Sequence, residues 1–173
     1  MKPVIDSEVL DVRVLDEAAP DEARDLLRPC CASAAWLVAM VRNRPYGTLD
    51  ALIERSDGAI ALLDWPDVEE ALAAHPRIGR QQTGTDRESG WSRQEQSGAT
   101  DLDPGTADDL VAGNLAYEER FGHVFLIRAT GRSAQEMLAE LRQRLGNDLE
   151  TERGVVRGEL AQIVRLRLAR AFQ

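Results

Sequence analysis

Histidine and cysteine, the side chains most often used for metal binding and redox chemistry, are scarce in this chain. Its 173 residues include two histidines and two cysteines, and the cysteines are neighbours at Cys30 and Cys31. Adjacent cysteines without partners elsewhere exclude a disulfide framework, and these four residues lack the spacing of a zinc site. We therefore expect Cys30 and Cys31 to be small core residues, and we expect no metal ligands.

Long hydrophobic runs and an excess of positive charge are also missing. The longest uncharged stretch, PCCASAAWLVAMV, is shorter than the roughly 20 residues that a bilayer requires. The first residues, MKPVIDSEVLDV, contain acids where a signal peptide would have an apolar core. The formal net charge of -9 repels nucleic-acid phosphates. These features favour a cytoplasmic protein that binds neither membranes nor nucleic acids.

Several families of enzymes are excluded by the motifs that the sequence does not contain. It has no Walker-type or dinucleotide-binding glycine motif and no Gly-x-Ser-x-Gly element. Its length and its hydrophobic fraction of 43% are typical of one soluble domain. We therefore predict a single domain over residues 1–173.

Helix signals dominate the chain. Pro20 and Pro66 suit the first turn of a helix, Thr48 and Thr106 suit N-caps, and Gly122 suits a helix end. Ser133 and Glu136 have capping-box spacing, and a last long helix is predicted over about residues 148–171. The stretch HVFLIRAT, residues 123–130, is apolar and β-branched, which predicts a buried extended segment. The expected fold class is all-α, a single compact multi-helix domain with one short extended segment.

Two polar stretches are predicted to interrupt the helices. Residues 56–58, Ser-Asp-Gly, have the composition of a turn. The glycine-rich stretch over residues 79–90 has no apolar period and predicts a loop. Ser92 and Glu95, which follow it, have the spacing of a capping box at a new helix start.

His75 occupies an unexpected position on the helix predicted after Pro66. The apolar stripe of this helix runs through Val68, Ala71 and Leu72, and His75 is the next residue on that face. The helix dipole favours the protonated ring there, whereas burial favours the neutral ring. Such a ring is expected to titrate near neutral pH and to transfer protons. The alternative is a structural histidine bonded to a backbone carbonyl.

Arg167 is a second polar residue on an apolar face, in the last helix. It shares that face with Leu160, Ile163 and Val164, whereas Arg165 points to the opposite side. A guanidinium in this position needs an anionic partner, because a buried unpaired charge is very unfavourable. The partner is either an internal carboxylate or a bound anionic ligand, and both remain open.

Glu95 is the third candidate, although its capping-box spacing alone explains it. A histidine, a glutamate and an arginine gathered in one pocket would supply acid–base chemistry together with anion binding. A catalytically silent helical scaffold or ligand-binding domain would instead keep these residues apart or paired internally. His123, in the extended segment, is expected to pack against its neighbours.

Four pieces of the sequence together resemble a known family. These are AHPRIG, SRQEQ about twenty residues later, NLAYEERFGHVFLIRATGRSAQEML, and IVRLRL near the end. Trp36 and the Arg-Pro-Tyr at 44–46 fit the same pattern, so the resemblance covers about residues 8–172. The pattern is similar to that of 2-oxo-4-hydroxy-4-carboxy-5-ureidoimidazoline (OHCU) decarboxylases, which act in urate degradation.

This resemblance implies an all-helical, cofactor-free and usually homodimeric enzyme that converts OHCU to (S)-allantoin and carbon dioxide. It implies catalytic roles for His75 and Glu95, and for Arg165 or Arg167, of which the helix face favours Arg167. Where many members have Phe-Gly-Phe, this chain has His123 after Phe-Gly, which could place a second titratable ring near the site. The implied substrate-binding residues are Pro76, Ser92, Arg93, Gln94, Gln96, Phe125, Leu126, Ile127, Arg128 and Ala129.

Overall fold

The computed structural model describes residues 9–80, 84, 86–99 and 102–173. Across these residues the chain is helical and forms no strand; Leu10 and Phe172 make an isolated bridge. The α-helices are α1 (Val12–Glu17), α2 (Pro20–Leu27), α3 (Ala34–Arg42), α4 (Leu49–Ala61), α5 (Trp65–Ala73), α6 (Arg87–Glu95), α7 (Pro104–Phe121), α8 (Ala134–Arg144) and α9 (Leu149–Ala171), with a 3-10 turn η1 at Ser97–Ala99. The predicted all-α class is confirmed.

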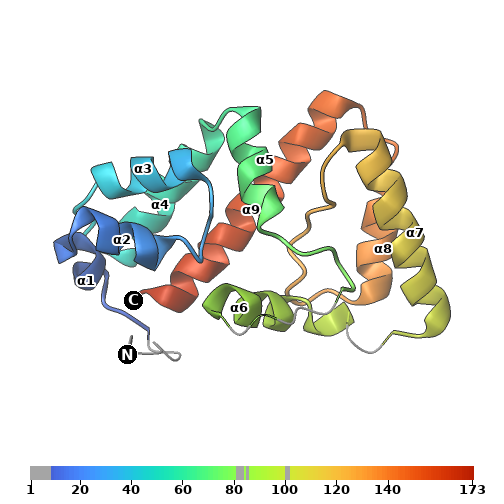
Figure 1. Ribbon diagram of the computed structural model, residues 1–173, viewed down its shortest axis with the longest axis horizontal. Coiled ribbons are helices and arrows are strands. Elements are labelled where there is room, and N and C mark those ends of the chain that lie inside the picture. The colour runs from blue at the N-terminus through green and yellow to red at the C-terminus, as the bar shows by residue number, and fades with distance from the viewer. Residues whose placement is uncertain (1–8, 81–83, 85, 100–101) are drawn as a thin grey trace.

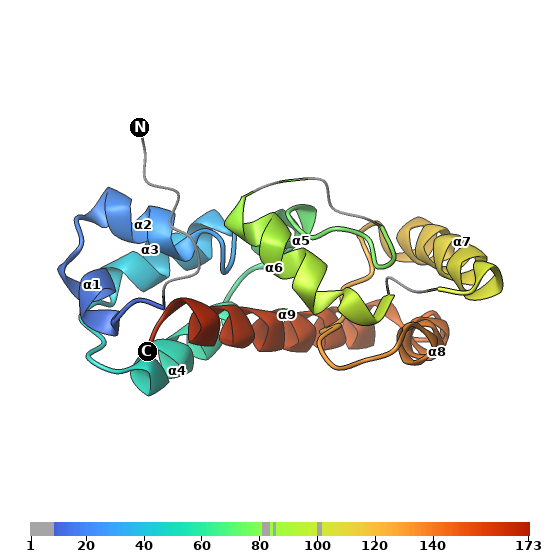
Figure 2. The ribbon, with the colours of Figure 1, turned by 90° about the horizontal axis from the view of Figure 1, so that it is seen from below.

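The longest helix, α9, is the axis of the molecule. It runs diagonally through the view of Figure 1, with α1 to α4 beside its C-terminal half and α7 and α8 near its N-terminal end. The view from below shows α6 lying across α9 between these two groups (Figure 2). The site described below lies where α5, α6 and α9 approach one another.

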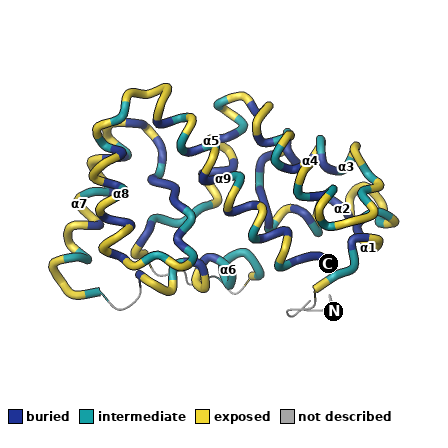
Figure 3. Tube along the Cα trace, turned by 180° about the vertical axis from the view of Figure 1, so that it is seen from behind, coloured by how far each residue is buried: buried dark blue, intermediate teal, exposed yellow. Residues whose placement is uncertain are grey.

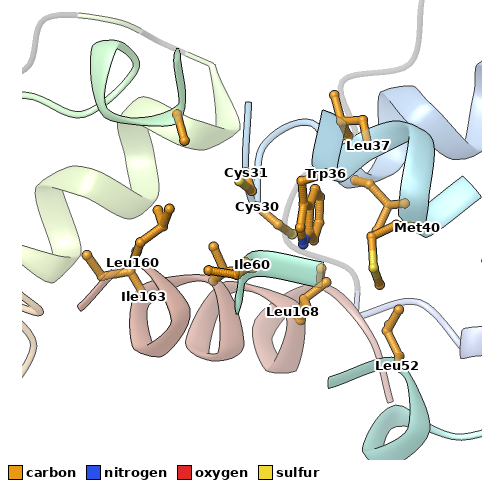
Figure 4. Packing of buried hydrophobic residues seen from close by; sticks show 14 of the residues in the cluster. Cys30, Cys31, Trp36, Leu37, Met40, Leu52, Ile60, Leu160, Ile163 and Leu168 are labelled. Atoms are coloured by element: carbon orange, nitrogen blue, oxygen red, sulfur yellow. The ribbon is translucent and has the colours of Figure 1, made fainter. Parts of the chain in front are cut away.

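Two hydrophobic clusters flank this central region. The larger cluster joins α1 to α5 with α9, and Figure 4 shows Trp36, Met40 and Ile60 packed over Leu160 and Leu168 of α9. Cys30 and Cys31 belong to this cluster and are buried free thiols, as expected. The smaller cluster joins α7 and α8 with most of the segment between them, and Figure 3 shows how far that segment is buried.

Several helix ends agree with the capping residues predicted from the sequence. Thr48 caps α4, Ser133 and Glu136 form the capping box of α8, and Gly122 ends α7 with φ of 79°. Residues 123–129 are buried for the most part and form neither helix nor strand, in agreement with the predicted extended segment. The N-cap of α7 is Asp103 rather than Thr106, which instead donates its N–H and hydroxyl to Asp103.

Two predicted interruptions are wrong. Residues 56–58 lie inside α4, because Ser56 is buried and its hydroxyl accepts the indole N–H of Trp36 at 3.1 Å. This tertiary contact outweighs the turn propensity of the sequence. The loop predicted over 79–90 ends earlier, since Asp86 caps α6 by accepting the N–H of Ser89 at 2.7 Å. Of that stretch, residues 81–83 and 85 lie outside the described residues.

Replacing two glycines, Gly158 and Gly98, by alanine should change the stability of the protein in opposite directions. A Cβ on Gly158 in α9 would meet nothing within 4 Å, so Gly158→Ala should raise the free energy of unfolding. The expected gain is about 0.5–1 kcal/mol, from helix propensity. A Cβ on Gly98 in η1 would lie 2.2 Å from the carbonyl oxygen of Arg132. Gly98→Ala should therefore destabilise by about 1–3 kcal/mol. Urea unfolding of both variants tests this; equal effects would contradict it.

Candidate active site

A small pocket lies between the end of α5, the C-terminal turn of α6 and the segment that joins α7 to α8. Its free volume is about 20 Å³, which is room for about one water molecule. A ring-sized ligand must therefore widen it. The lining residues are His75, Pro76, Ile78, Ser92, Glu95, Gln96, Phe125, Leu126, Ile127, Ala129 and Ile163.

His75 reaches this pocket because α5 ends just before it. The helix closes at Ala73, the backbone N–H of His75 still bonds to the carbonyl of Leu72 at 2.9 Å, and Pro76 prevents continuation. Burial disfavours the charged ring and the Arg167 guanidinium repels it, which lowers the pKa of His75 to about 3. The expectation that this ring titrates near neutral pH is therefore wrong. Burial outweighs the helix dipole, and His75 is neutral at pH 7.

Glu95 faces the same pocket from α6, and a buried arginine holds it there. The guanidinium of Arg167 grips the carboxylate with two parallel bonds of 3.0 Å, from Nε to Oε1 and from Nη2 to Oε2. Arg167 is 1% exposed and Glu95 is 8% exposed. Bidentate geometry of this kind is what makes arginine the preferred partner of a buried carboxylate.

The capping-box interpretation of Glu95 is wrong, because Ser92 and Glu95 lie at the end of α6 and not at its start. Ser92 instead accepts Nη2 of Arg167 at 3.1 Å, and Arg170 donates to Glu95 at 3.2 Å. Within the described residues, no hydrogen bond connects Glu95 to His75. Glu95 is therefore fixed by two arginines.

Arg167 has internal partners in this structure, as the first of the two alternatives left open by the sequence expects. Besides Glu95 and Ser92, it donates Nη1 to the carbonyl of Pro29 at 3.2 Å and lies 3.7 Å from Glu88. It is not among the residues that line the pocket. The anion that neutralises this guanidinium is thus an internal carboxylate.

Arg165 lies on the other side of α9, as the helix face predicts. Its guanidinium is half-exposed and pairs with Asp57 of α4, away from the pocket. Arg93 and Gln94 are exposed on α6 and do not line the pocket, so the structure does not bring these two expected residues to the site. Nor does Arg128 line it, although its backbone N–H is bound by Glu159.

His123 packs in an aromatic cluster and does not line the pocket. Its Nδ1 donates to the carbonyl of Val124 at 3.0 Å, and its ring centroid lies 5.2 Å from Trp65 and 5.4 Å from Tyr117. The expectation of a packed ring is confirmed, and the pocket contains His75 as its titratable ring.

Sequence reasoning missed four residues of this region. Ile78 and Ile163 line the pocket, while Glu88 and Arg170 extend the charged network around Arg167. Ile163 could have been found, because it lies one turn before Arg167 on the same helix face. Glu88 was hidden by the loop assigned to its segment, and Arg170 contacts Glu95 across a distance in sequence that no local pattern reveals.

These observations define the class of protein. It is an all-helical domain in which a neutral imidazole and a carboxylate face one small pocket, without a group of three or more metal-binding side chains in the described part of the chain. No helix among the described residues is long and apolar enough to cross a membrane.

Comparison with known proteins identifies the family. The OHCU decarboxylase family model matches residues 16–169, and the chain belongs to this family. It is 31% identical over 147 residues to the 2-oxo-4-hydroxy-4-carboxy-5-ureidoimidazoline decarboxylase of Amia calva, covering 84% of this chain and 81% of that protein. A crystal structure of OHCU decarboxylase in the presence of (S)-allantoin superposes with a TM-score of 0.73 at 28% identity, over 84% of this chain and 95% of that one.

Other relatives are longer proteins. The uric acid degradation bifunctional protein TTL of Arabidopsis thaliana is 30% identical over 158 residues, which are 89% of this chain and 48% of that protein. The chain thus spans about half or less of the bifunctional relatives that it matches.

The lowered pKa of His75 gives a direct prediction. In an NMR titration from about pH 5 to pH 8, the His75 ring should keep the chemical shifts of a neutral imidazole. The unfolded chain binds a proton at this ring near about pH 6.5, whereas the folded chain does not. The free energy of unfolding should therefore fall as the pH drops below that value. The chain has two histidines, so a His123→Phe variant assigns the signals. A His75 midpoint between about pH 6 and 7 would contradict this prediction.

Proposed function

We propose that this chain decarboxylates OHCU to (S)-allantoin and carbon dioxide. The observation that supports this most strongly is that His75 and Glu95 line one pocket together with Phe125, Leu126, Ile127 and Ala129. The alternative, a catalytically silent scaffold, would keep His75, Glu95 and Arg167 apart or paired internally, as Glu95 and Arg167 are here; the shared pocket of His75 and Glu95 is what favours the enzyme. The other residues proposed to contact substrate are Pro76, Ser92, Gln96, Phe125, Leu126, Ile127 and Ala129.

The substrate ring can itself accept the electron pair released by decarboxylation. The protein groups at the site then need only to position the substrate and to transfer protons. When the bond to the carboxyl carbon breaks, carbon dioxide leaves and the electron pair forms a C=C bond to the adjacent ring carbon, while the pair of the C=N bond moves onto the ring nitrogen, which takes up a proton from water. The hydroxyl then loses its proton as a carbonyl forms, and the neighbouring carbon gains one. His75, neutral in the free protein, accepts the hydroxyl proton and returns a proton to carbon from one face, which sets the (S) configuration.

Arg167 acts through Glu95 in this proposal. Its two bonds to Glu95 fix the carboxylate at the pocket wall, and a guanidinium facing the substrate carboxylate would stabilise the ground state and hinder loss of carbon dioxide. We therefore propose that Arg167 is a positioning residue and that His75 and Glu95 contact the substrate. Direct binding of an anionic oxygen by Arg167 would require it to release Glu95.

The test of the proposed activity is incubation with freshly generated OHCU, followed by optical activity. Protonation of the planar carbon in free solution would have no preferred face and would give a racemate, so the expected result is an optical rotation that appears only with the protein. Conversion no faster than the spontaneous reaction would favour the scaffold alternative. We also propose a homodimer in the cytoplasm, as the family resemblance implies; light scattering on the purified chain tests the assembly.

Replacing His75 should separate chemistry from folding. His75→Asn should lower kcat by about 100-fold or more, because the acid–base group is lost. The fold should survive, since His75 lies beyond the end of α5. The matched control is His123→Phe, which keeps an aromatic ring in the neighbouring cluster and should stay within about threefold of wild-type activity. A fully active His75→Asn enzyme would refute the mechanism.

Lysine substitutions should distinguish the two arginines of α9. Arg167→Lys keeps the charge but cannot make both bonds to Glu95, so kcat should fall by about tenfold or more while KM changes less. Arg165→Lys should be nearly silent, since its partner Asp57 is on the outer side of the helix. Activity per folded molecule and urea unfolding are measured together. A rise in KM with unchanged kcat for Arg167→Lys would indicate substrate binding instead.

Chelators should leave the activity unchanged. The described residues contain no group of three or more side chains suited to a metal ion, and the substrate ring itself accepts the electron pair. Turnover is measured after dialysis against EDTA and again after adding divalent metal. Loss of activity that zinc, magnesium or manganese restores would show that a metal takes part.

A further inference from the structure

One wall of the pocket contains backbone groups that have no hydrogen-bond partner among the described residues. Ile127 is 2% exposed and lines the pocket. Among the hydrogen bonds of the described residues, neither its N–H nor its C=O takes part in one. Buried backbone groups are almost always paired, so an unpaired donor and an unpaired acceptor on one residue indicate a ligand or a water at this place.

Two side chains hold the peptide units on either side of Ile127. Arg144 donates Nη1 to the carbonyl of Leu126 at 2.8 Å, and Glu159 accepts the backbone N–H of Arg128 at 2.6 Å. Each bond uses one end of a planar trans peptide, whose C=O and N–H point in opposite directions. The other ends are the N–H and the C=O of Ile127.

Both anchors connect the segment to α9. Arg144 is itself held by Glu152 of α9 at 2.6 Å, and both side chains are almost fully buried. Glu152 and Glu159 are seven residues apart and share one face of α9. The N–H of Ile127 therefore points away from the Arg144 bond and its C=O away from the Glu159 bond, and the pocket is the space that Ile127 lines.

From this arrangement we infer that Glu159 is a positioning residue that sets the specificity of the pocket for a cyclic ureide. An N–H and a C=O on one residue match the ring carbonyl and the adjacent ring nitrogen of such a ligand, as in a hydrogen-bonded pair of an antiparallel sheet. The inference rests on the proposed function, because OHCU and allantoin both contain this edge. Arg144 assists Glu159 from the other peptide.

Variants of Glu159 test this role. Glu159→Gln keeps an oxygen that accepts the Arg128 N–H and should stay within about threefold of wild-type KM. Glu159→Ala frees that peptide and should raise KM for OHCU and Kd for allantoin about tenfold or more, with a smaller change in kcat. The matched control is Asp16→Ala, which removes a carboxylate that accepts the N–H groups of Tyr46 and Gly47 at 2.8 Å, far from the pocket. It should lower Tm and leave KM unchanged.

Hydrogen exchange separates failure of this inference from failure of the proposed function. In the free protein, the Arg128 amide should exchange slowly in wild type and in Glu159→Gln, and at least about tenfold faster in Glu159→Ala. This measurement can be made even if the wild type does not convert OHCU. That result would overturn the proposed function but not the positioning role of Glu159. Unchanged exchange of Arg128 in Glu159→Ala, or a rise in KM that is as large in Asp16→Ala, would overturn the positioning role.

Discussion

The buried ion pair between Glu95 and Arg167 is the interaction on which the site depends. Removing two charges from water is costly unless each finds close partners, and here the guanidinium is engaged by Glu95, Ser92 and the carbonyl of Pro29. These partners come from segments that are far apart in the sequence. The pair therefore fixes where α6 lies across α9, and with it where the carboxylate of Glu95 meets the pocket. The same guanidinium helps to keep His75 neutral, so one buried cation influences both proposed catalytic groups.

Other buried polar residues of α9 also hold segments that form the pocket. It is mostly apolar where it faces the core, yet Glu152, Glu159 and Arg167 are buried on it. Glu152 accepts from Tyr117 and from Arg144, which binds the pocket wall; Glu159 binds that wall directly. Each buried polar group on α9 thus orients an element that contributes to the pocket. A single rigid helix holds both sides of the site, which suits a reaction in which small displacements are costly.

Local signals in the sequence were sufficient for much of the fold and for part of the site. Gly122 and the Ser133–Glu136 box act within one helix turn, so their patterns predict the structure directly. The inward face of Arg167 follows equally from helical period. Ser92 and Glu95 could not be placed in this way, because a partner 72 residues away decides the role of Glu95. The neutral state of His75 depends on burial, which the apolar stripe of its helix indicates, and also on Arg167, which that helix does not reveal.

The most direct test of this account is a double-mutant cycle on the central pair. The free energy of unfolding is measured for the wild type, for Glu95→Gln, for Arg167→Gln and for the double variant. If the pair fixes α6 on α9, each single variant leaves a buried charge without its main partner, and the coupling energy should be at least about 2 kcal/mol. Effects that add within about 0.5 kcal/mol would show that the two side chains act independently, and the account would be wrong.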